Sequence, residues 1–241
     1  MTEDRIFAKA ATTAGSFEFN ADVAAVFPDM LERSIPGYAA SIAAIGTLAS
    51  RYVLPDTRCY DLGCSLGAAT LAMRRGIEVS GCRIIAVDNA PAMLARCREV
   101  VAADNSAVEV TVIEDDVQNV DISGASMIVM NYTLQFLPVA TRDRMIRKIY
   151  AGMVDGGIFV LSEKVLHEDH AAEELLVQMH HEFKRKNAYS DLEISRKRTA
   201  IEDVLVPESI ATHRARLGRA GFRQSEVWLK HFNFASLIAI R

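Results

Sequence analysis

The spacing of hydrophobic positions changes near residue 55. Between Asp22 and Tyr52 apolar residues recur at helical spacing, and Pro36-Gly37 divides this stretch into two predicted helices. After Pro55 the pattern becomes short apolar runs rich in β-branched residues, with helical stretches between them. These runs are "RCYDLG", "RIIAVD", "EVTVIED", "SMIVMN" and "GIFVLSE". Strands that alternate with helices predict βαβ units and a mostly parallel sheet.

Two further segments depart from this alternation. The chain ends in two strand-like runs, Ser225 to Phe232 and Ala235 to Arg241, with Asn233 near a tight turn. They predict an antiparallel hairpin that completes a seven-stranded sheet. The polar, mainly helical segment from about 165 to 217 predicts an insertion over the carboxyl ends of the strands, where ligands bind in open α/β sheets. The first fifteen residues lack periodicity, and we expect them to be loose or folded over the ligand.

Composition narrows the class of protein. A chain of 241 residues accommodates one large α/β domain, which we expect to span residues 1–241 with N-terminal helices at about 17–52. The net charge of −4 and the pI near 5.9 argue against direct nucleic-acid binding. No apolar run approaches the roughly 20 residues that span a bilayer, and the N-terminus resembles no signal segment. We therefore expect a cytoplasmic protein away from the membrane.

The cysteines suggest no metal chemistry. The chain has four, and none forms a CxxC pair or stands near a histidine at metal-ligand spacing. Cys59 and Cys82 adjoin apolar runs and are expected in the core as free thiols. We expect no bound metal.

The stretch "YDLGCSLGAATL" predicts a ligand-binding turn. A strand ending at Asp61 is followed by Gly63 and Gly67, and a helix is expected from about Ala68. Glycines let the backbone approach a ligand closely, and the start of a helix presents free N–H groups to it. Ser65 stands where many such turns carry a third glycine. A tight connection without any ligand remains the alternative.

Three further strand ends carry polar candidates. Asp88 follows Gly63 by about 25 residues, near the spacing at which an acid reaches a ribose, although it could instead cap the helix that begins near Pro91. Asp116, rather than Asp115, is the expected partner for an exocyclic amine such as that of adenine, with Val117 as an apolar wall. Asn131 offers a donor and an acceptor to a polar ligand.

These features resemble the S-adenosylmethionine-dependent class I methyltransferase fold, a Rossmann-like α/β architecture. The turn "GCSLG" is not the GxGxxG of dinucleotide enzymes, which makes a hydride-transfer enzyme the weaker interpretation. Six motifs are similar, more narrowly, to the bacterial carboxy-S-adenosyl-L-methionine synthase family. They are "FPDMLERSIPGY", "YDLGCSLGAATLAMRR", "NYTLQFL", "LSEK", "MHHEFKRKNAYSDLEIS" and "HFNFASLIAI", and the similarity runs from about Phe17 to Arg241.

This resemblance implies an activity. Members convert S-adenosylmethionine and prephenate to carboxy-S-adenosylmethionine and phenylpyruvate. The product passes to a tRNA carboxymethyltransferase partner, which builds 5-oxyacetic acid on the wobble uridine of tRNA. The resemblance also suggests a homodimer. It leaves open whether Arg198, one of the ligand contacts that it implies, serves the cavity of its own subunit or that of a neighbour.

The resemblance also implies ligand contacts. They fall on Tyr38, Gly63, Cys64, Ser65, Asp88, Asn89, Asp116, Val117, Asn131 and Arg198. Val117 and Tyr132 depart from the isoleucine and phenylalanine that are common in the family.

A cation is required because the product gains a carboxylate beside the sulfonium. An arginine fork matches both carboxylate oxygens, and the resemblance selects Arg198 from "SRKRT" as the catalytic residue. From the sequence alone, Arg196, Lys197 and Arg198 are expected to form a solvated face, as most basic runs do, and Lys184 to Lys186 are expected in solvent. No proton donor for the hydroxyl that leaves prephenate stands out among Tyr38, His181 and Tyr189.

The sequence is also compatible with two other functions. The first is an ordinary small-molecule methyltransferase, which would release S-adenosylhomocysteine. The second is a non-catalytic S-adenosylmethionine-binding subunit of a tRNA-modifying complex, which would bind the ligand without turnover.

Overall fold

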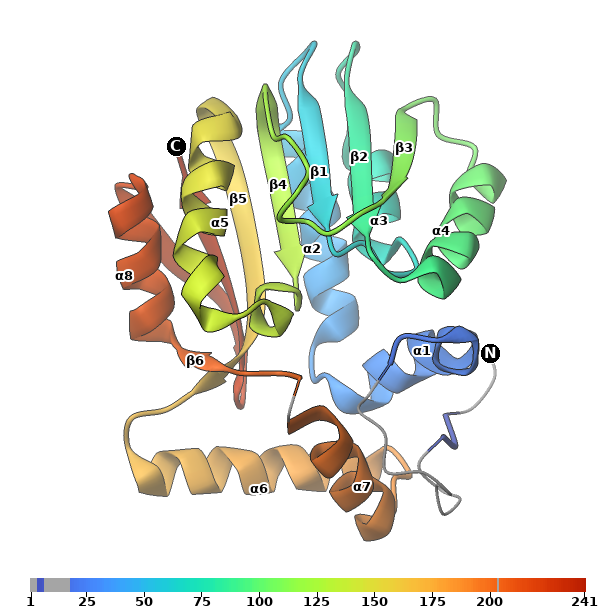
Figure 1. The fold of residues 1–241 in the computed structure, drawn as a ribbon, viewed down its shortest axis with the longest axis vertical. Coiled ribbons are helices and arrows are strands. Elements are labelled where there is room, and N and C mark those ends of the chain that lie inside the picture. Colours follow the sequence, from blue (N-terminus) through green and yellow to red (C-terminus); the bar gives the residue numbers. More distant parts are fainter. Residues whose placement is uncertain (1–3, 7–17, 203) are drawn as a thin grey trace.

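A central, mostly parallel sheet organises the molecule (Figure 1). The computed structural model describes residues 4–6, 18–202 and 204–241, and its sheet has the strand order β3-β2-β1-β4-β5-β8-β7. The parallel strands are β1 (Arg58–Leu62), β2 (Arg83–Asp88), β3 (Glu109–Glu114), β4 (Ala125–Asn131) and β5 (Met153–Leu166). The strands β7 (Gln224–His231) and β8 (Phe234–Ile240) form the predicted hairpin, in which β8 runs antiparallel to β5.

Helices cover both faces of this sheet. On one face lie α2 (Tyr38–Tyr52), α3 (Ala68–Gly76) and α4 (Pro91–Ala103), and on the other lie α5 (Val139–Gly152) and α8 (Ile210–Ala220). Side chains alternate between the two cores along each buried strand, as strand geometry requires. In β4, Ile128 and Met130 pack toward α5, whereas Met127 and Val129 pack toward α2.

The break between the first two helices lies where the sequence predicts it. Asn20 caps the start of the helix α1 (Ala21–Ser34), and its side chain accepts the Val23 N–H at 3.1 Å. Gly37 then adopts the left-handed conformation, with φ of 78°, immediately before α2. Left-handed backbone favours glycine, which is why the chain can turn here.

The elements inserted after β5 lie across the carboxyl ends of the strands. Here α6 (His170–Lys186) and α7 (Asp191–Glu202) lie lowest in Figure 1, and α1, from the start of the chain, lies above α7. The predicted end of the insertion, at 217, is wrong, because it falls inside α8. Leu217 is 1% exposed and belongs to the core beneath α5, so α8 is part of the cover of the sheet.

A short strand returns the chain from the insertion. The two-residue strand β6 (Glu208–Ser209) pairs in parallel with the end of β5, which the sequence did not reveal. Glu208 accepts hydrogen bonds from Arg142 at 2.5 Å and from Arg216 at 2.7 Å. Arg142 is fully buried, and its pairing with Glu208 fixes where the insertion ends.

Part of the N-terminal segment is tied to the insertion. Asp4 is 1% exposed, and its backbone N–H donates to Asp29 of α1 at 2.7 Å. Its carboxylate accepts a hydrogen bond from Tyr189 and lies 3.6 Å from the ammonium of Lys197. The expectation of a loose or ligand-covering start falls mainly on residues 7–17, which lie outside the described part of the chain.

Candidate functional site

One large cavity opens at the carboxyl ends of the parallel strands. Its volume is about 1330 Å³, and α1, α2, α6 and α7 enclose it together with the ends of β1, β2 and β4. All ten residues singled out from the sequence line it. They are Tyr38, Gly63, Cys64, Ser65, Asp88, Asn89, Asp116, Val117, Asn131 and Arg198. The fold therefore brings together residues that are up to 160 positions apart in the chain (198 − 38 = 160).

The glycine turn has the geometry of a close backbone approach. Gly63 has φ of 87°, and a Cβ there would overlap the side chain of Thr133. Gly67 has φ of 86° and directly precedes α3. Ser65 also adopts a left-handed conformation, with φ of 49°, which explains why related turns often carry glycine at this position.

Asp88 is joined to this turn. Its Oδ2 accepts the backbone N–H of Ser65 at 2.9 Å, and its Oδ1 accepts that of Ala90 at 2.9 Å. Burial raises the pKa of Asp88, while these backbone hydrogen bonds oppose the rise. Ala90, not Asp88, occupies the cap position of α4, so simple helix capping does not describe Asp88. Each carboxylate oxygen retains capacity for a further hydrogen bond.

The two acids after β3 have different surroundings. The carboxylate of Asp115 is engaged within its own loop, where it accepts the Asn119 side-chain amide at 2.9 Å. Asp116 lines the cavity and accepts the Gln118 N–H at 2.8 Å. Val117, 6% exposed, supplies the apolar wall beside it. This placement agrees with the preference for Asp116 over Asp115.

Asp61 is a candidate to which the sequence assigned no role. It is 1% exposed, and its Oδ2 accepts the Thr70 hydroxyl at 2.6 Å. Burial raises its pKa to about 6. Its Oδ1 is buried and has no hydrogen-bond partner among the described residues. Its position at the end of β1, directly before the glycine turn, was the only available signal.

Two more buried polar atoms share this property. Ser65 Oγ and Asn131 Oδ1 are inaccessible and have no hydrogen-bond partner within the described chain, and both residues line the cavity. Buried polar atoms are normally paired in folded proteins. The unpaired oxygens of Asp61, Ser65 and Asn131 therefore fit a bound group rich in N–H and O–H donors, which an adenosyl amino acid is.

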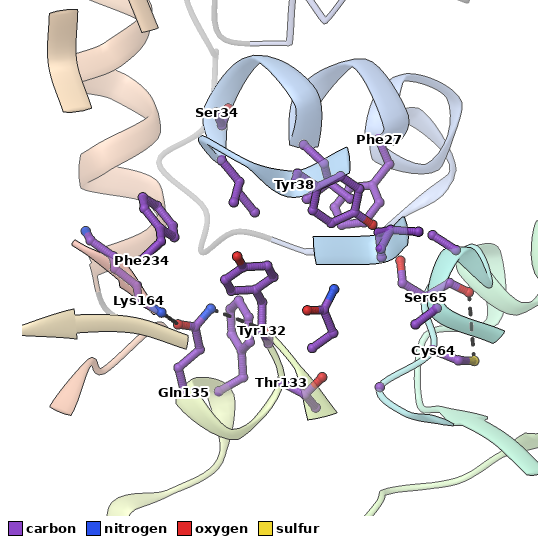
Figure 2. A pocket seen from close by; sticks show the side chains of 18 of the residues that line it. Phe27, Ser34, Tyr38, Cys64, Ser65, Tyr132, Thr133, Gln135, Lys164 and Phe234 are labelled. Atoms are coloured by element: carbon purple, nitrogen blue, oxygen red, sulfur yellow. Dashed lines mark hydrogen bonds between the residues drawn. The ribbon is translucent and has the colours of Figure 1, made fainter. Parts of the chain in front are cut away.

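Aromatic rings form the middle of the cavity (Figure 2). The rings of Tyr38 and Tyr132 lie 6.5 Å apart, and Phe234 packs edge-on to Tyr132 at 6.0 Å. Burial raises the pKa of both tyrosines, which are therefore neutral phenols at physiological pH. Tyr132 also has φ of 63°, a strained conformation for a bulky residue that is typical of functional sites. Aromatic faces attract cations such as a sulfonium.

Cations line the opposite end of the cavity. They are Lys164 of β5, Lys184 of α6, and Lys197 and Arg198 of α7; His181 of α6 also lines this end, but burial and its basic neighbours lower its pKa and favour the neutral imidazole. The expectation that Lys184 lies in solvent is wrong, because Lys184 is only 8% exposed, as is Lys197. Arg198 is exposed at the rim of the cavity. Lys184 and Lys197 come from two different helices that meet only in the folded chain. A run of basic residues in the sequence does not show that they line the same cavity, which is why the sequence did not identify them.

Other polar candidates have structural partners. His180 donates from Nε2 to the Ser34 carbonyl at 2.8 Å, and burial lowers its pKa to about 3. Tyr189 is held by Asp4, as described above, and does not line the cavity. Cys59 is buried as predicted, whereas Cys82 is only half-buried. In the described ranges no cluster of three His, Cys, Asp or Glu side chains could hold a metal ion.

Comparisons with known proteins agree with this geometry. A family model described as "Methyltransferase domain" matches residues 60–157. Carboxy-S-adenosyl-L-methionine synthase of Aliivibrio fischeri is 54% identical over 99% of this chain and 98% of its own length. The protein of the same name from Yersinia enterocolitica is 52% identical over 99% of this chain and 90% of its own length.

Solved structures share the fold at low identity. Human N-acetylserotonin methyltransferase, in complex with SAM, superposes with a TM-score of 0.63 at 16% identity, over 92% of this chain and 55% of its own. Magnesium protoporphyrin IX methyltransferase of Synechocystis, with bound SAM, has a TM-score of 0.59 at 13% identity and covers 98% of this chain and 88% of its own.

The sheet order, the closing hairpin and the site at the strand ends define a class I S-adenosylmethionine-dependent methyltransferase fold, as the sequence predicts, and the chain is an enzyme of the transferase class. Relatives at more than 50% identity match it over nearly its whole length. The chain belongs to the carboxy-S-adenosyl-L-methionine synthase family. In the part of the chain that the structure describes, no helix is both long and apolar enough to cross a membrane.

Proposed function

We propose that the enzyme converts S-adenosylmethionine and prephenate to carboxy-S-adenosylmethionine, phenylpyruvate and water. The observation that carries this proposal is the division of one cavity into two ends. Polar oxygens that suit an adenosyl amino acid line the end at the glycine turn, and cations that suit a carboxylate line the end at α6 and α7. Binding of the methyl donor alone would not require the cationic end of the cavity, which therefore points to a second, anionic reactant.

The donor fits the first end through residues of this chain. Asp88 would accept hydrogen bonds from the ribose hydroxyls, and Asp116 would accept the adenine amine beside Val117. Asp61 and Asn131 would face the donor's ammonium group. The tyrosine rings at positions 38 and 132 would lie near the sulfonium, whose positive charge their faces attract.

The proposed reaction balances without an outside acid or base. As prephenate loses its ring carboxylate, the electron pair of that carbon–carbon bond expels the ring hydroxyl as hydroxide, and the ring becomes aromatic. Hydroxide takes a proton from the sulfonium methyl group and becomes water. The resulting carbanion, stabilised by the adjacent sulfonium, attacks carbon dioxide, and the new carbon–carbon bond creates the carboxylate. The missing proton donor is then unnecessary, and the reaction assigns no role to a metal.

Arg198 would hold the carboxylate before and after its transfer. Its guanidinium can form two parallel hydrogen bonds to a carboxylate, which fixes the distance over which the carbon moves. Enclosure by α1, α6 and α7 would exclude water from the reacting atoms and would hold the released carbon dioxide beside the carbanion until they react.

The biological setting follows from the same family. We place the enzyme in the cytoplasm as a homodimer, and its product would supply a tRNA carboxymethyltransferase that modifies the wobble uridine. The acidic net charge of −4 suits an enzyme that hands on a small molecule and does not bind tRNA itself.

Mass spectrometry of the nucleoside product tests the function. Wild-type enzyme with S-adenosylmethionine and prephenate should yield a donor heavier by one carbon dioxide, and omission of prephenate should abolish this species. Arg198→Ala should lose the product, whereas Arg196→Ala, on the same helix but away from the cavity, should retain it. Release of S-adenosylhomocysteine with methylation of another compound would support the ordinary methyltransferase instead. Donor binding without turnover would support the non-catalytic subunit.

A further inference from the structure

The cavity wall carries acids at the strand ends and basic side chains on α6, α7 and β5. Glu32 of α1 and Glu173 of α6 also line it, and Glu173 pairs with His167 at 3.0 Å. Figure 2 shows Cys64 and Ser65 on one side, Lys164 and Phe234 on the other, and the tyrosine rings between them. The acidic residues of the cavity wall at the strand ends are Asp61, Asp88 and Asp116, and the cations of α6, α7 and β5 were named above. The donor, which carries a sulfonium and an ammonium, suits the acidic side. The cationic side is left for an anionic reactant.

Lys184 is the least satisfied of these cations. It is 8% exposed and lines the cavity, and its ammonium has no hydrogen-bond or ion-pair partner within residues 4–6, 18–202 and 204–241. Lys197, equally buried, differs because its ammonium donates to Ser34 Oγ at 2.8 Å and lies 3.6 Å from Asp4. An unpaired buried ammonium disfavours folding, so its position calls for a compensating ligand.

The surroundings of Lys184 strengthen this requirement. Burial, together with the positive charges of Lys197, Lys164 and Arg198, lowers its pKa to about 7. His180 and His181, on the same helix, also lie within electrostatic reach of Lys184. No carboxylate contributes to this shift, so an anionic ligand beside Lys184 would offset the repulsion and restore the charged ammonium.

We infer that Lys184 binds a carboxylate of the second substrate, and that this substrate is a dicarboxylate whose other acid group lies at Arg198. The inference rests on the proposed function, because it assigns Arg198 to the carboxylate that is transferred. A monocarboxylate at Arg198 would leave the ammonium of Lys184 unpaired. A dianion satisfies both cations at once, and prephenate, with a ring carboxylate and a pyruvyl carboxylate, has this chemistry.

The donor's own carboxylate is the competing ligand for Lys184. It would also pair with the ammonium, but then loss of Lys184 would weaken donor binding. The two possibilities therefore differ in which reactant loses affinity.

Calorimetry on four proteins separates them. Prephenate is titrated into enzyme saturated with S-adenosylhomocysteine, which lacks the methyl group and cannot react, and donor binding is measured separately. The proteins are the wild type, Lys184→Met, Lys184→Arg and Lys186→Met. Methionine has similar length without charge, arginine restores the charge, and Lys186 is an exposed lysine of the same helix away from the cavity.

We expect Lys184→Met to weaken prephenate binding at least tenfold, with donor affinity within twofold of wild type. Lys184→Arg should recover part of the loss, and Lys186→Met should bind like the wild type. The inference is overturned if the wild type does not bind prephenate, if Lys184→Met matches Lys186→Met, or if Lys184→Met loses donor affinity to the same degree. Binding that depends on Lys184, without carboxylated product, would leave this inference standing and overturn the proposed function alone. If Lys184→Met formed the carboxylated product as well as the wild type and bound prephenate equally tightly, this inference would be overturned and the proposed function would stand.

Discussion

The carboxylate of Asp88 accepts a hydrogen bond from the backbone N–H of Ser65 at 2.9 Å. This contact joins the end of β2 to the turn after β1, so the two strongest signals in the sequence are parts of one structure. The remaining acceptor capacity of Asp88 is therefore held in a fixed place relative to the glycine turn. Rigid placement of a polar group lowers the entropy lost on binding.

Asp88 should be essential for donor affinity. We expect Asp88→Ala to weaken S-adenosylmethionine binding by roughly 10- to 100-fold, because hydrogen bonds to a charged group contribute about 1.5–3 kcal/mol. Calorimetry measures this directly. The matched control is Glu114→Gln, since Glu114 ends the neighbouring strand opposite Asp88 but is exposed and outside the cavity. Equal affinity of the two variants would remove Asp88 from the donor site.

Donor affinity should also depend on pH through Asp61. Burial raises the pKa of Asp61 to about 6, and a cationic donor favours its ionised form. Affinity should therefore fall as the pH drops below about 6, because the carboxyl must first lose a proton. Asp88, whose pKa burial also raises, acts in the same direction. Asp61→Asn should flatten the dependence below pH 6 but not abolish it. An unchanged slope would show that Asp61 does not meet the donor's cation.

Glycine at position 76 should be required for packing of α2 on α3. A Cβ at Gly76 would overlap the carbonyl oxygen of Gly46, which is backbone and cannot rotate away. We expect Gly76→Ala to lower the free energy of unfolding by about 1–3 kcal/mol, measured by urea denaturation. Gly218→Ala, in α8 with no atom within 4 Å of the added methyl, should raise it by roughly 0.5–1 kcal/mol. Similar effects of both substitutions would contradict this packing.

Glu163 should make the folded state less stable as the pH rises. It is 1% exposed, and burial raises its pKa from 4.5 to about 8, although its Oε1 accepts the Leu134 N–H at 3.1 Å. Between these pH values the folded chain binds more protons than the unfolded chain. This contribution to stability is complete below about pH 4.5 and is lost as the pH rises through 8. Glu163→Gln should therefore unfold at a temperature that varies less between pH 5 and 8 than that of the wild type. An identical slope for both proteins would refute the shift.

Strand ends were predictable because β2, β3 and β4 stop at a polar residue and β1 has one just before its end. Asp61, Asp88 and Asn131 all lie at the same edge of the sheet, so sequence position was enough to bring them together. The glycine turn was also predictable, because left-handed backbone favours glycine and both Gly63 and Gly67 adopt that conformation.

The insertion was less predictable because its environment comes from other segments. Lys184 and Lys186 are alike in sequence, yet only the first is buried in the fold, where α1 and α7 pack on α6. The end of the insertion was misplaced because α8 is amphipathic and polar outside, as α6 is, and only its packing on α5 assigns it to the sheet. The pattern of hydrophobic and polar residues along a helix does not show which other element that helix packs against.

The central claim is that carbon moves from an acid in the cationic end of the cavity to the methyl group of a donor in the other end. The most direct measurement uses prephenate labelled with ¹³C in its ring carboxylate, in buffer containing unlabelled bicarbonate, followed by mass spectrometry of the adenosyl product. We predict that the new carboxyl group carries the label almost completely, because the carbon dioxide never leaves the cavity. Product that takes its carboxyl carbon from bicarbonate, or a donor that loses its methyl group and gains no carbon, would contradict the account.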